Sequence, residues 1–363
     1  MKIAMVTDHL LSGGKERRMV ELMKALSKNP KYEFTIVLLE GKDDSSIAYR
    51  DILNCPVRFI YFGRYNRWQL VRQSYLLCKK ENFDLIHLWA ALVYGYILAP
   101  THYMLRIPMI SSSITSARKQ GGKKFWMNKL TYHFYDKILS NSKQAFVINE
   151  VPDNKAVCIY NGFNPERLQV KATVKEIRDR YGIKTSFIVS MAGEYSQRKD
   201  YPLFVKAANK VLPTNPDVTF IAMGSGDSTS YEVLIEKRFS DRIKFVGRVT
   251  DVESVYNASD IVVLATTVEG VSNAIMEGMS LGKPIVSTYG PYVGTAEIVE
   301  DNNSGFLVKY HDAEAFADRI IKLLNDDLLR MRMGERGKRI VDEKFNIQQM
   351  IDGFAGVYDR YIR

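Results

Sequence analysis

Short β-branched runs alternate with amphipathic helical stretches along the chain of 363 residues, and this alternation limits the fold more than any other feature. Lys2–Thr7 predicts a strand, Gly14–Ser27 predicts a helix with its apolar side chains on one face, and Phe34–Leu39 predicts the next strand. Asp84–His87 and Pro108–Ser111 predict further strands. Strands that are joined through helices form parallel βαβ units, so the first part of the chain should contain a parallel sheet.

The same alternation begins again after the irregular polar stretch Asn164–Lys184. Two α/β domains follow from this restart, and the length suits two domains at roughly 100–200 residues each. The expected strands of the second domain are Ser186–Ala192, Val218–Met223, Ile243–Val246, Ile261–Ala265, Pro284–Ser287 and Phe306–Val308. We therefore predict two tandem doubly wound, Rossmann-like domains, residues 1–170 and 171–345, whose facing sheets leave a cleft. The tail Ile347–Ile362 predicts an amphipathic helix that docks on a domain.

Composition limits where the chain works. The sequence starts without the apolar run of a signal peptide, and its longest apolar run, Leu88–Pro100, is shorter than the ~20 residues of a spanning helix. The three cysteines, Cys55, Cys78 and Cys158, form neither a CxxC pair nor a metal-binding spacing. We expect a protein of the reducing cytosol that is not integral to a membrane, with the cysteines serving as small buried hydrophobes.

Positive charge is concentrated in one half of the chain. The net charge is +10; residues 1–150 carry +11 and the remainder −1. This excess is consistent with a solvated surface, or with an anionic partner such as a phospholipid surface or a phosphate-linked acceptor. Nucleic acid is not expected, because no DNA- or RNA-binding motif accompanies the charge. The segment Arg118–Trp126 mixes cations with aromatics and could lie on anionic lipid headgroups or be an exposed loop.

The most informative stretch runs from Glu269 to Glu277. It follows the expected strand Ile261–Ala265 and opens a helix, so the backbone N–H groups of Ser272, Asn273 and Ala274 lack helical partners. A helix N-terminus favours anions and suits a diphosphate, while a carboxylate on each side can accept hydrogen bonds from sugar and ribose hydroxyls. Two glutamates at this spacing are common by themselves, and their position after a strand of the second domain is what points to a site.

Two other loops follow strands. Residues 193–200 contain the adjacent cations Arg198 and Lys199, which could clamp a leaving diphosphate or belong to a plain polar loop. After the first strand, Gly13 and Gly14 would let the backbone approach a ligand, although a tight turn explains them equally simply. They match neither the P-loop nor the dinucleotide fingerprint.

Together these features resemble glycosyltransferase family 4, which has the GT-B fold. The resemblance covers essentially the whole chain. It is carried by Gly13-Gly14, Asn161-Gly162-Phe163, Gly193…Lys199, Gly224-Ser225-Gly226, Val246-Gly247-Arg248, Glu269…Glu277, Pro284–Ser287 and Asn302–Val308 in this order. It implies that the tail helix crosses back to the first domain.

The resemblance also implies roles around the sugar and the diphosphate. Glu277 would bind the ribose, and Glu269 would contact hydroxyls of the donor sugar. The segment Val271–Ala274 would line the sugar and the diphosphate. Lys199 would neutralise the diphosphate together with Arg198, so these two cations and Glu269 are the expected catalytic residues.

The remaining donor contacts come from other loops. Val246 and Arg248 would hold the base. Gly13 and Gly14 would bring the first domain up to the donor, and Gly193 and Glu194 would lie beside it.

Two positions depart from the family pattern. The family usually has Arg where this chain has Glu194, and Arg198 would supply the missing cation. The family often has His after the strand at Pro108–Ser111, where this chain has Ile114 or a serine. His87 corresponds to a different position with a structural role. No DxD follows a strand, so we expect activity without a metal or other cofactor.

The expected function is that of a retaining glycosyltransferase. It would move a sugar from a UDP- or GDP-linked donor to a glycan or lipid-linked acceptor in cell-surface polysaccharide biosynthesis, such as that of lipopolysaccharide or capsule. The protein would work in the cytoplasm, with peripheral contact to the anionic inner face of the membrane through its basic first domain. Two alternatives are a non-hydrolysing sugar-nucleotide epimerase of similar fold and a non-catalytic nucleotide-sugar-binding homologue.

Overall fold

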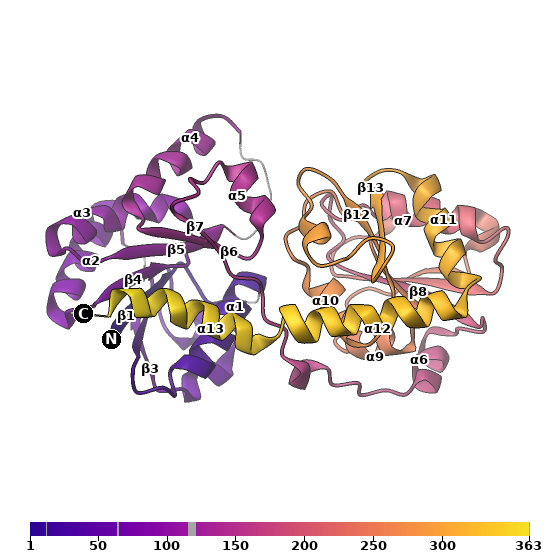
Figure 1. Ribbon diagram of the computed structural model, residues 1–363, viewed down its shortest axis with the longest axis horizontal. Coiled ribbons are helices and arrows are strands. Elements are labelled where there is room, and N and C mark those ends of the chain that lie inside the picture. Colours follow the sequence, from indigo (N-terminus) through magenta and orange to yellow (C-terminus); the bar gives the residue numbers. More distant parts are fainter. Residues whose placement is uncertain (12, 64, 115–120, 363) are drawn as a thin grey trace. The chain divides into compact units, whose positions relative to one another are not determined.

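The structure is a computed structural model that describes residues 1–11, 13–63, 65–114 and 121–362. The chain divides into two compact units (Figure 1). The first unit is Met1–Gly162 together with Ile347–Arg363, and the second is Phe163–Asn346. The first boundary thus falls after Gly162, whereas the sequence placed it near residue 170.

The first unit is built on a parallel sheet. Within the described residues its seven strands have the order β3-β2-β1-β4-β5-β6-β7. The order reverses between β1 and β4, and loops at such a switch point are where ligands bind in doubly wound sheets. The strands are β1 (Lys2–Thr7), β2 (Glu33–Leu38), β3 (Val57–Tyr61), β4 (Leu85–Leu88), β5 (Met109–Ile114), β6 (Lys137–Ser140) and β7 (Ala156–Cys158).

Helices cover both faces of this sheet, because alternate side chains of each strand point to opposite faces. Ile3 and Met5 pack with α1 and α13 in one buried cluster. Ala4 and Val6 pack in a second cluster on the opposite face, with α2, α3 and α5. The helices are α1 (Gly14–Leu26), α2 (Arg67–Glu81), α3 (Gly95–Leu105), α4 (Gly122–Thr131), α5 (Lys143–Asn149) and α13 (Ile347–Tyr358).

The second unit repeats the plan. Its six-stranded sheet in the described residues is parallel, with the order β10-β9-β8-β11-β12-β13. The switch point here lies between β8 and β11. The strands are β8 (Phe187–Ala192), β9 (Val218–Met223), β10 (Ile243–Phe245), β11 (Ile261–Leu264), β12 (Ile285–Tyr289) and β13 (Gly305–Lys309). The helices are α6 (Val174–Tyr181), α7 (Tyr201–Val211), α8 (Thr229–Glu232), α9 (Val252–Ala258), α10 (Asn273–Ser280), α11 (Ala313–Leu324) and α12 (Asp327–Lys344).

The predicted fold, two tandem doubly wound α/β domains, is confirmed. Three strands of the first sheet, β3, β6 and β7, were not anticipated. The stretch Asn164–Lys184 is not irregular throughout, because α6 forms within it. Thr173 and Glu176 form a capping box at the start of α6, and Gly182 ends the helix in the left-handed conformation.

The tail helix α13 belongs to the first unit, as the sequence resemblance implied. Its Phe354 and Tyr358 are fully buried, and the Tyr358 hydroxyl lies 2.8 Å from Nδ1 of His87 in β4. Nε2 of His87 lies 2.8 Å from the Ser112 hydroxyl of β5. His87 therefore has a structural role in joining α13 to the sheet. Among the described residues, no helix is both long and apolar enough to cross a bilayer.

Candidate functional site

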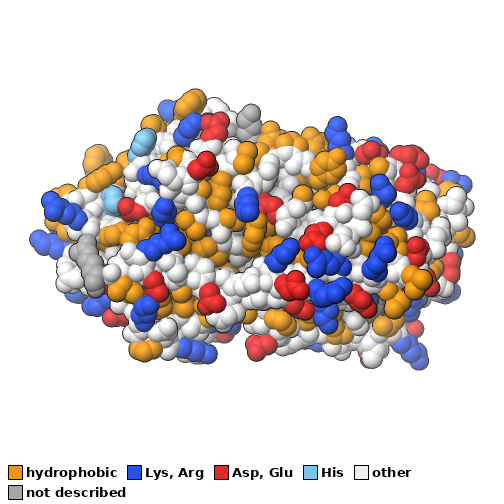
Figure 2. Space-filling view, in the orientation of Figure 1, with side chains coloured by type: hydrophobic (Ala, Val, Ile, Leu, Met, Phe, Trp, Pro, Cys, Tyr) orange, Lys and Arg blue, Asp and Glu red, His pale blue; other side chains and the backbone are white. Residues whose placement is uncertain are grey.

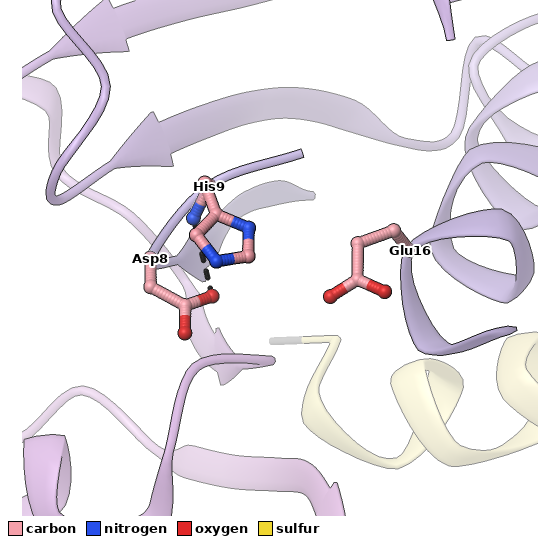
Figure 3. A group of neighbouring side chains, drawn as sticks. All are labelled: Asp8, His9 and Glu16. Carbon is pink, nitrogen blue, oxygen red and sulfur yellow. Dashed lines mark hydrogen bonds between the residues drawn. The ribbon is translucent and has the colours of Figure 1, made fainter. Parts of the chain in front are cut away.

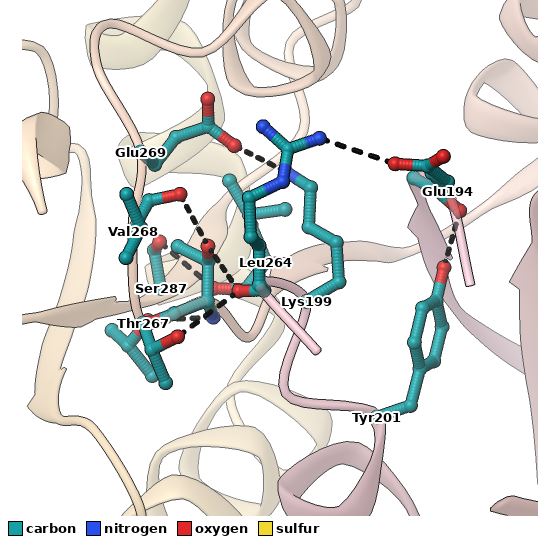
Figure 4. A network of polar contacts seen from close by, with 12 residues as sticks. Glu194, Lys199, Tyr201, Leu264, Thr267, Val268, Glu269 and Ser287 are labelled. Carbon is teal, nitrogen blue, oxygen red and sulfur yellow. Dashed lines mark hydrogen bonds and ion pairs between the residues drawn. The ribbon is translucent and has the colours of Figure 1, made fainter. Parts of the chain in front are cut away.

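The centre of the candidate site is an ion pair between Lys199 and Glu269 (Figure 4). Lys199 lies in the loop after β8, and Glu269 lies in the loop after β11, the strand that neighbours β8 at the switch point. Both side chains are largely buried, at 12% and 24% exposed. The structure thus brings together two of the three residues expected to be catalytic, at the carboxyl ends of two adjacent strands.

Close backbone packing holds the Lys199 side chain in place. A Cβ on Gly193 would lie 3.0 Å from Cε of Lys199, so the glycine leaves room for the lysine to run along the loop. The Tyr201 hydroxyl donates to the Gly193 carbonyl at 2.6 Å. A Cβ on Gly224 would lie only 2.0 Å from that same carbonyl oxygen. Two glycines and a buried tyrosine therefore set the path of the lysine.

The loop that holds Glu269 is anchored to the next loop of the sheet. The Glu269 N–H donates to the Tyr292 carbonyl at 3.0 Å, and the Gly294 N–H donates to the Glu269 carbonyl at 2.8 Å. In the same loop, the Thr266 N–H donates to the Thr288 hydroxyl at 2.9 Å. Sequence reasoning missed these supports, since a loop that follows a strand carries no signal for which neighbouring loop it will pair with.

Arg198 points differently from Lys199. Its guanidinium pairs with Glu194 at 3.1 Å, and both side chains are more than half exposed. Its carbonyl oxygen accepts from the Thr266 hydroxyl at 2.9 Å and from the Thr267 N–H at 2.9 Å. Arg198 therefore fastens the two loops through its backbone, while its side chain lies at the surface with Glu194. Glu194, which stands where the family usually has Arg, and Arg198, which was expected to supply the missing cation, are thus partners in one ion pair.

Helix α10 begins next to this pair in the chain. Val271 and Ser272 are buried, and Asn273 and Ala274 are partly buried. Among the described residues, the Ser272 side chain makes no capping hydrogen bond to the helix. The N–H groups of the first turn therefore keep their capacity to bind an anion. Glu277, partly buried one turn into the helix, lies near the buried hydroxyl of Tyr256, whose pKa is raised by burial first and by this carboxylate second.

The residues expected to hold the base lie at the far edge of the sheet, after β10. The Val246 N–H donates to the Ala222 carbonyl at 3.0 Å, and Gly247 adopts a left-handed conformation with φ 69°. The Tyr195 hydroxyl accepts from the Gly247 N–H at 3.2 Å and donates to the Ala222 carbonyl at 2.9 Å. Val246 is half-buried, whereas Arg248 is exposed. Tyr195 thus joins the loop after β8 to the loop after β10.

A buried carboxylate supports the lysine loop. Asp200 follows Lys199, is 6% exposed and accepts from the Leu203 N–H at 3.1 Å, which caps α7. Its other oxygen lies 2.6 Å from Nδ1 of His311, in the loop after β13. His311 has a left-handed backbone with φ 68°. Neither residue was predicted, and the position of Asp200 before an apolar helical run is the N-cap signal that could have identified it.

Gly13 and Gly14 lie in the first unit, where Gly13 is the N-cap of α1. Both the N–H and the carbonyl of Gly13 contact the Tyr49 hydroxyl, at 3.2 and 3.0 Å. A Cβ on Gly13 would lie 2.2 Å from a carboxylate oxygen of Glu16. A side chain at position 13 would therefore displace the Glu16 carboxylate, which lies at the end of a flexible side chain.

Three side chains near these glycines have metal-ligand chemistry: Asp8, His9 and Glu16 (Figure 3). Their ligand atoms all lie within 4.8 Å of one another. The Lys15 ammonium lies 3.5 Å from Asp8 and 3.3 Å from Glu16 and supplies positive charge to the group. Burial raises the pKa of the Asp8 carboxyl, but Lys15, His9 and Thr7 outweigh it, so the net pKa is lowered. The independence from metal remains a prediction.

The position at which the family often has a histidine falls on Ile114 or on a neighbouring serine of this chain. Ile114 ends β5 and is buried. The neighbouring Ser113 hydroxyl donates to the Ala90 carbonyl. Residues 115–120, which include part of the basic segment Arg118–Trp126, lie outside the described residues.

Comparisons with known proteins agree with this arrangement. The family description "Glycosyltransferase Family 4" matches residues 12–167, and "Glycosyl transferases group 1" matches residues 186–326. The chain belongs to these glycosyltransferases. It is therefore an enzyme that transfers glycosyl groups from nucleotide sugars in polysaccharide or glycoconjugate biosynthesis.

Curated relatives include the N-acetyl-alpha-D-glucosaminyl L-malate synthase of Bacillus anthracis. It is 24% identical over 79% of this chain and 77% of its own length. The UDP-Gal:alpha-D-GlcNAc-diphosphoundecaprenol alpha-1,3-galactosyltransferase of Escherichia coli is 25% identical over 78% of this chain and 77% of its own.

Solved structures show the same fold in other glycosyltransferases. HepE of Anabaena, in complex with UDP and glucose, aligns with a TM-score of 0.78 at 19% identity over 99% of this chain and all of its own. A glycosyltransferase of Rickettsia africae aligns with a TM-score of 0.83 at 19% identity over 99% of this chain and 98% of its own. The GT-B fold expected from the sequence is confirmed.

Proposed function

We propose that this protein is a retaining glycosyltransferase that moves a sugar from a nucleotide diphosphate sugar, with UDP preferred over GDP, to a glycan or lipid-linked acceptor of the cell surface. The observation that carries the proposal is the Lys199–Glu269 pair at the switch point of the second sheet, with the N-terminus of α10 beside it in the chain. The preference for UDP is supported by relatives: UDP is present in HepE, and the E. coli relative is named for UDP-Gal.

The proposed role of the pair begins with an exchange of partners. Without donor, Lys199 and Glu269 neutralise each other in a largely buried setting. A diphosphate that reaches the first turn of α10 would bring stronger negative charge to the Lys199 ammonium. Glu269 would then be released to accept hydrogen bonds from hydroxyls of the donor sugar. Glu277, farther along α10, would accept from the ribose.

The proposed chemistry depends on charge that develops on the leaving diphosphate. As the glycosidic bond breaks, Lys199 and the helix N–H groups would stabilise that charge, a role that a divalent metal performs in other enzymes. We therefore propose catalysis without a metal or other cofactor. For retention, the leaving phosphate would accept the acceptor's proton on the same face of the sugar that the acceptor attacks.

The acceptor side is proposed for the first unit. Residues 1–150 carry +11, which favours a phosphate-linked acceptor and work at the cytoplasmic face of an anionic membrane. Such an acceptor would be a polysaccharide precursor of the lipopolysaccharide or capsule type.

The test is a transfer assay with UDP- and GDP-sugars, in which release of nucleoside diphosphate is measured and the anomeric proton of the product is read by NMR. We expect UDP release, a product with the anomeric configuration of the donor, and unchanged rates in EDTA. A product of inverted configuration would contradict retention, and a loss of activity in EDTA would contradict independence from metal. Conversion of the donor to a second nucleotide sugar without acceptor would identify an epimerase instead.

A further inference from the structure

Helix α4 exposes large apolar side chains, which surface helices normally turn toward the protein core. Trp126 is 62% exposed and Leu130 is 56% exposed, and Met127 between them is also exposed. Because these residues are spaced by one, three and four positions, they lie on one face of the helix. Lys123, three positions before Trp126, extends the same face. Helix α4 is therefore amphipathic with its apolar face turned outward.

Helix α3, which contacts α4, also exposes apolar side chains. Tyr103 and Met104 are 57% and 67% exposed. The two helices are joined by the Tyr96 hydroxyl, which donates to the Met127 carbonyl at 2.8 Å. The ring of Phe134 contacts both Tyr96 and Tyr103, with centroids 5.3 and 6.4 Å apart. We call the five exposed residues Tyr103, Met104, Trp126, Met127 and Leu130 the α3–α4 face.

Acidic residues are absent from the stretch of sequence that contains α3 and α4. Residues 85–135 contain six Lys and Arg and no Asp or Glu. Lys123 and Lys124 are exposed in the first turn of α4, where the helix dipole adds to their positive charge. Lys129 lies 5.3 Å from the Trp126 ring centroid and pairs with Glu150 of the adjacent segment. In Figure 2, hydrophobic and basic side chains adjoin at the edge of the first unit where Figure 1 places α4.

We propose that the α3–α4 face docks on an anionic lipid bilayer, with Trp126, Leu130 and Met104 entering the interface and Lys123 and Lys124 contacting lipid phosphates. Exposed aromatic and aliphatic side chains beside lysines are typical of surfaces that lie in the headgroup region. A second copy of this chain is a poorer partner, because a symmetric contact would oppose two clusters of lysines. The biological role of this surface rests on the proposed transfer to a lipid-linked acceptor. Its binding to vesicles can be measured without donor or acceptor.

The test is flotation of the full chain with vesicles of phosphatidylcholine, with and without phosphatidylglycerol. We expect binding only to the anionic vesicles, and weaker binding at high salt. Lys123→Ala/Lys124→Ala should bind roughly 30-fold more weakly, at about 1 kcal/mol for each lysine. The separate variant Trp126→Ser/Leu130→Ser should lose most of the affinity of the unmodified protein for anionic vesicles. These residues are exposed, so both variants should fold.

Matched controls lie in the second unit. Lys338→Ala/Arg339→Ala removes two exposed adjacent cations from α12, and Leu328→Ser/Met331→Ser replaces two exposed apolar residues of the same helix. Both controls should bind vesicles as the unmodified protein does. Equal binding by the α3–α4 variants and these controls would overturn the proposal, as would failure to bind anionic vesicles. A change of oligomeric state in Trp126→Ser/Leu130→Ser without loss of vesicle binding would instead identify a contact between copies and would also overturn it.

Tryptophan fluorescence gives an independent readout. The chain has three tryptophans, and in a Trp68→Phe variant only the fully buried Trp89 and the exposed Trp126 remain. Brominated lipids should then quench the emission of Trp126, and quenching should disappear in Trp68→Phe/Trp126→Phe. Transfer to a short soluble acceptor, measured without vesicles, should be unchanged in all these variants. If the unmodified protein showed no transfer to the soluble acceptor, the proposed transferase function would be contradicted, whereas the vesicle-binding result would still stand.

Discussion

Replacement of Lys199 by alanine tests the candidate site most sharply. The Lys199 side chain is 12% exposed and its ammonium group contacts Glu269, so its charge acts in a setting with little water. Removal of one such electrostatic contact from a transition state costs about 100- to 1000-fold in rate, or about 3–4 kcal/mol. The loss also leaves Glu269 without its cation, but this carboxylate is 24% exposed and reaches solvent. We therefore expect a loss of stability of only about 1–2 kcal/mol.

The assay is UDP release measured as kcat/KM, together with urea unfolding of the same preparations. Lys210→Ala is the matched control, because Lys210 also pairs with a glutamate, Glu314, but both side chains are well exposed. The control should change neither quantity measurably. If Lys199→Ala retained the kcat/KM of the unmodified protein, the proposed role of the lysine would be wrong. If Lys199→Ala/Glu269→Ala recovered the activity that the single substitution loses, the pair would be structural only.

Three further predictions follow from the contacts around the two sheets. Glu269→Gln keeps the shape of the side chain and removes its charge; it should lower kcat/KM by about 5- to 150-fold, or about 1–3 kcal/mol of transition-state stabilisation, with a rise in KM for the sugar donor as the signature. Gly224→Ala would place a Cβ 2.0 Å from the Gly193 oxygen and should cost about 3 kcal/mol of unfolding free energy in urea, whereas Gly356→Ala in α13, where a Cβ meets nothing within 4 Å, should stabilise by about 1 kcal/mol. Burial first, and Arg18 second, lower the pKa of His87, so the unfolded chain binds a proton at a pH at which the folded chain does not. The free energy of unfolding should therefore fall as the pH drops below about 6.5, by up to ~1.4 kcal/mol per pH unit. His87→Gln should remove this pH dependence.

The alternation of strand and helix signals was sufficient to predict the two-sheet fold, because hydrophobic periodicity in βαβ units is local and strong. The strands that were missed are short or only partly buried. Residues 57–61 are half-exposed, and β7 has three residues. The helix α6 was missed although Thr173 and Glu176 carry a capping-box signature. Charged surface residues, which dominate that helix, gave no clear apolar face.

The candidate site was predictable in its loops but not in its pairings. Position after a strand pointed to Lys199 and Glu269, because parallel strands end at one edge. Their direct contact depends on which strands neighbour each other in the sheet. β8 has β9, the next strand in sequence, on one side and β11 on the other, and local sequence patterns do not predict the second neighbour. The Arg198–Glu194 pair and the contact of Asp200 with His311 arise from loop conformations that no local pattern encodes.

Binding of the donor diphosphate at the Lys199–Glu269 site is the central claim, and the thermal unfolding midpoint with UDP, a UDP-sugar or uridine tests it most directly. A ligand that binds the native state at about 100 times its Kd stabilises it by about 2.7 kcal/mol. We predict that UDP and the UDP-sugar raise the midpoint, that uridine, which lacks the diphosphate, raises it far less, and that Lys199→Ala loses most of the difference. Equal shifts with UDP and uridine, or an equal UDP shift in Lys199→Ala, would contradict the account.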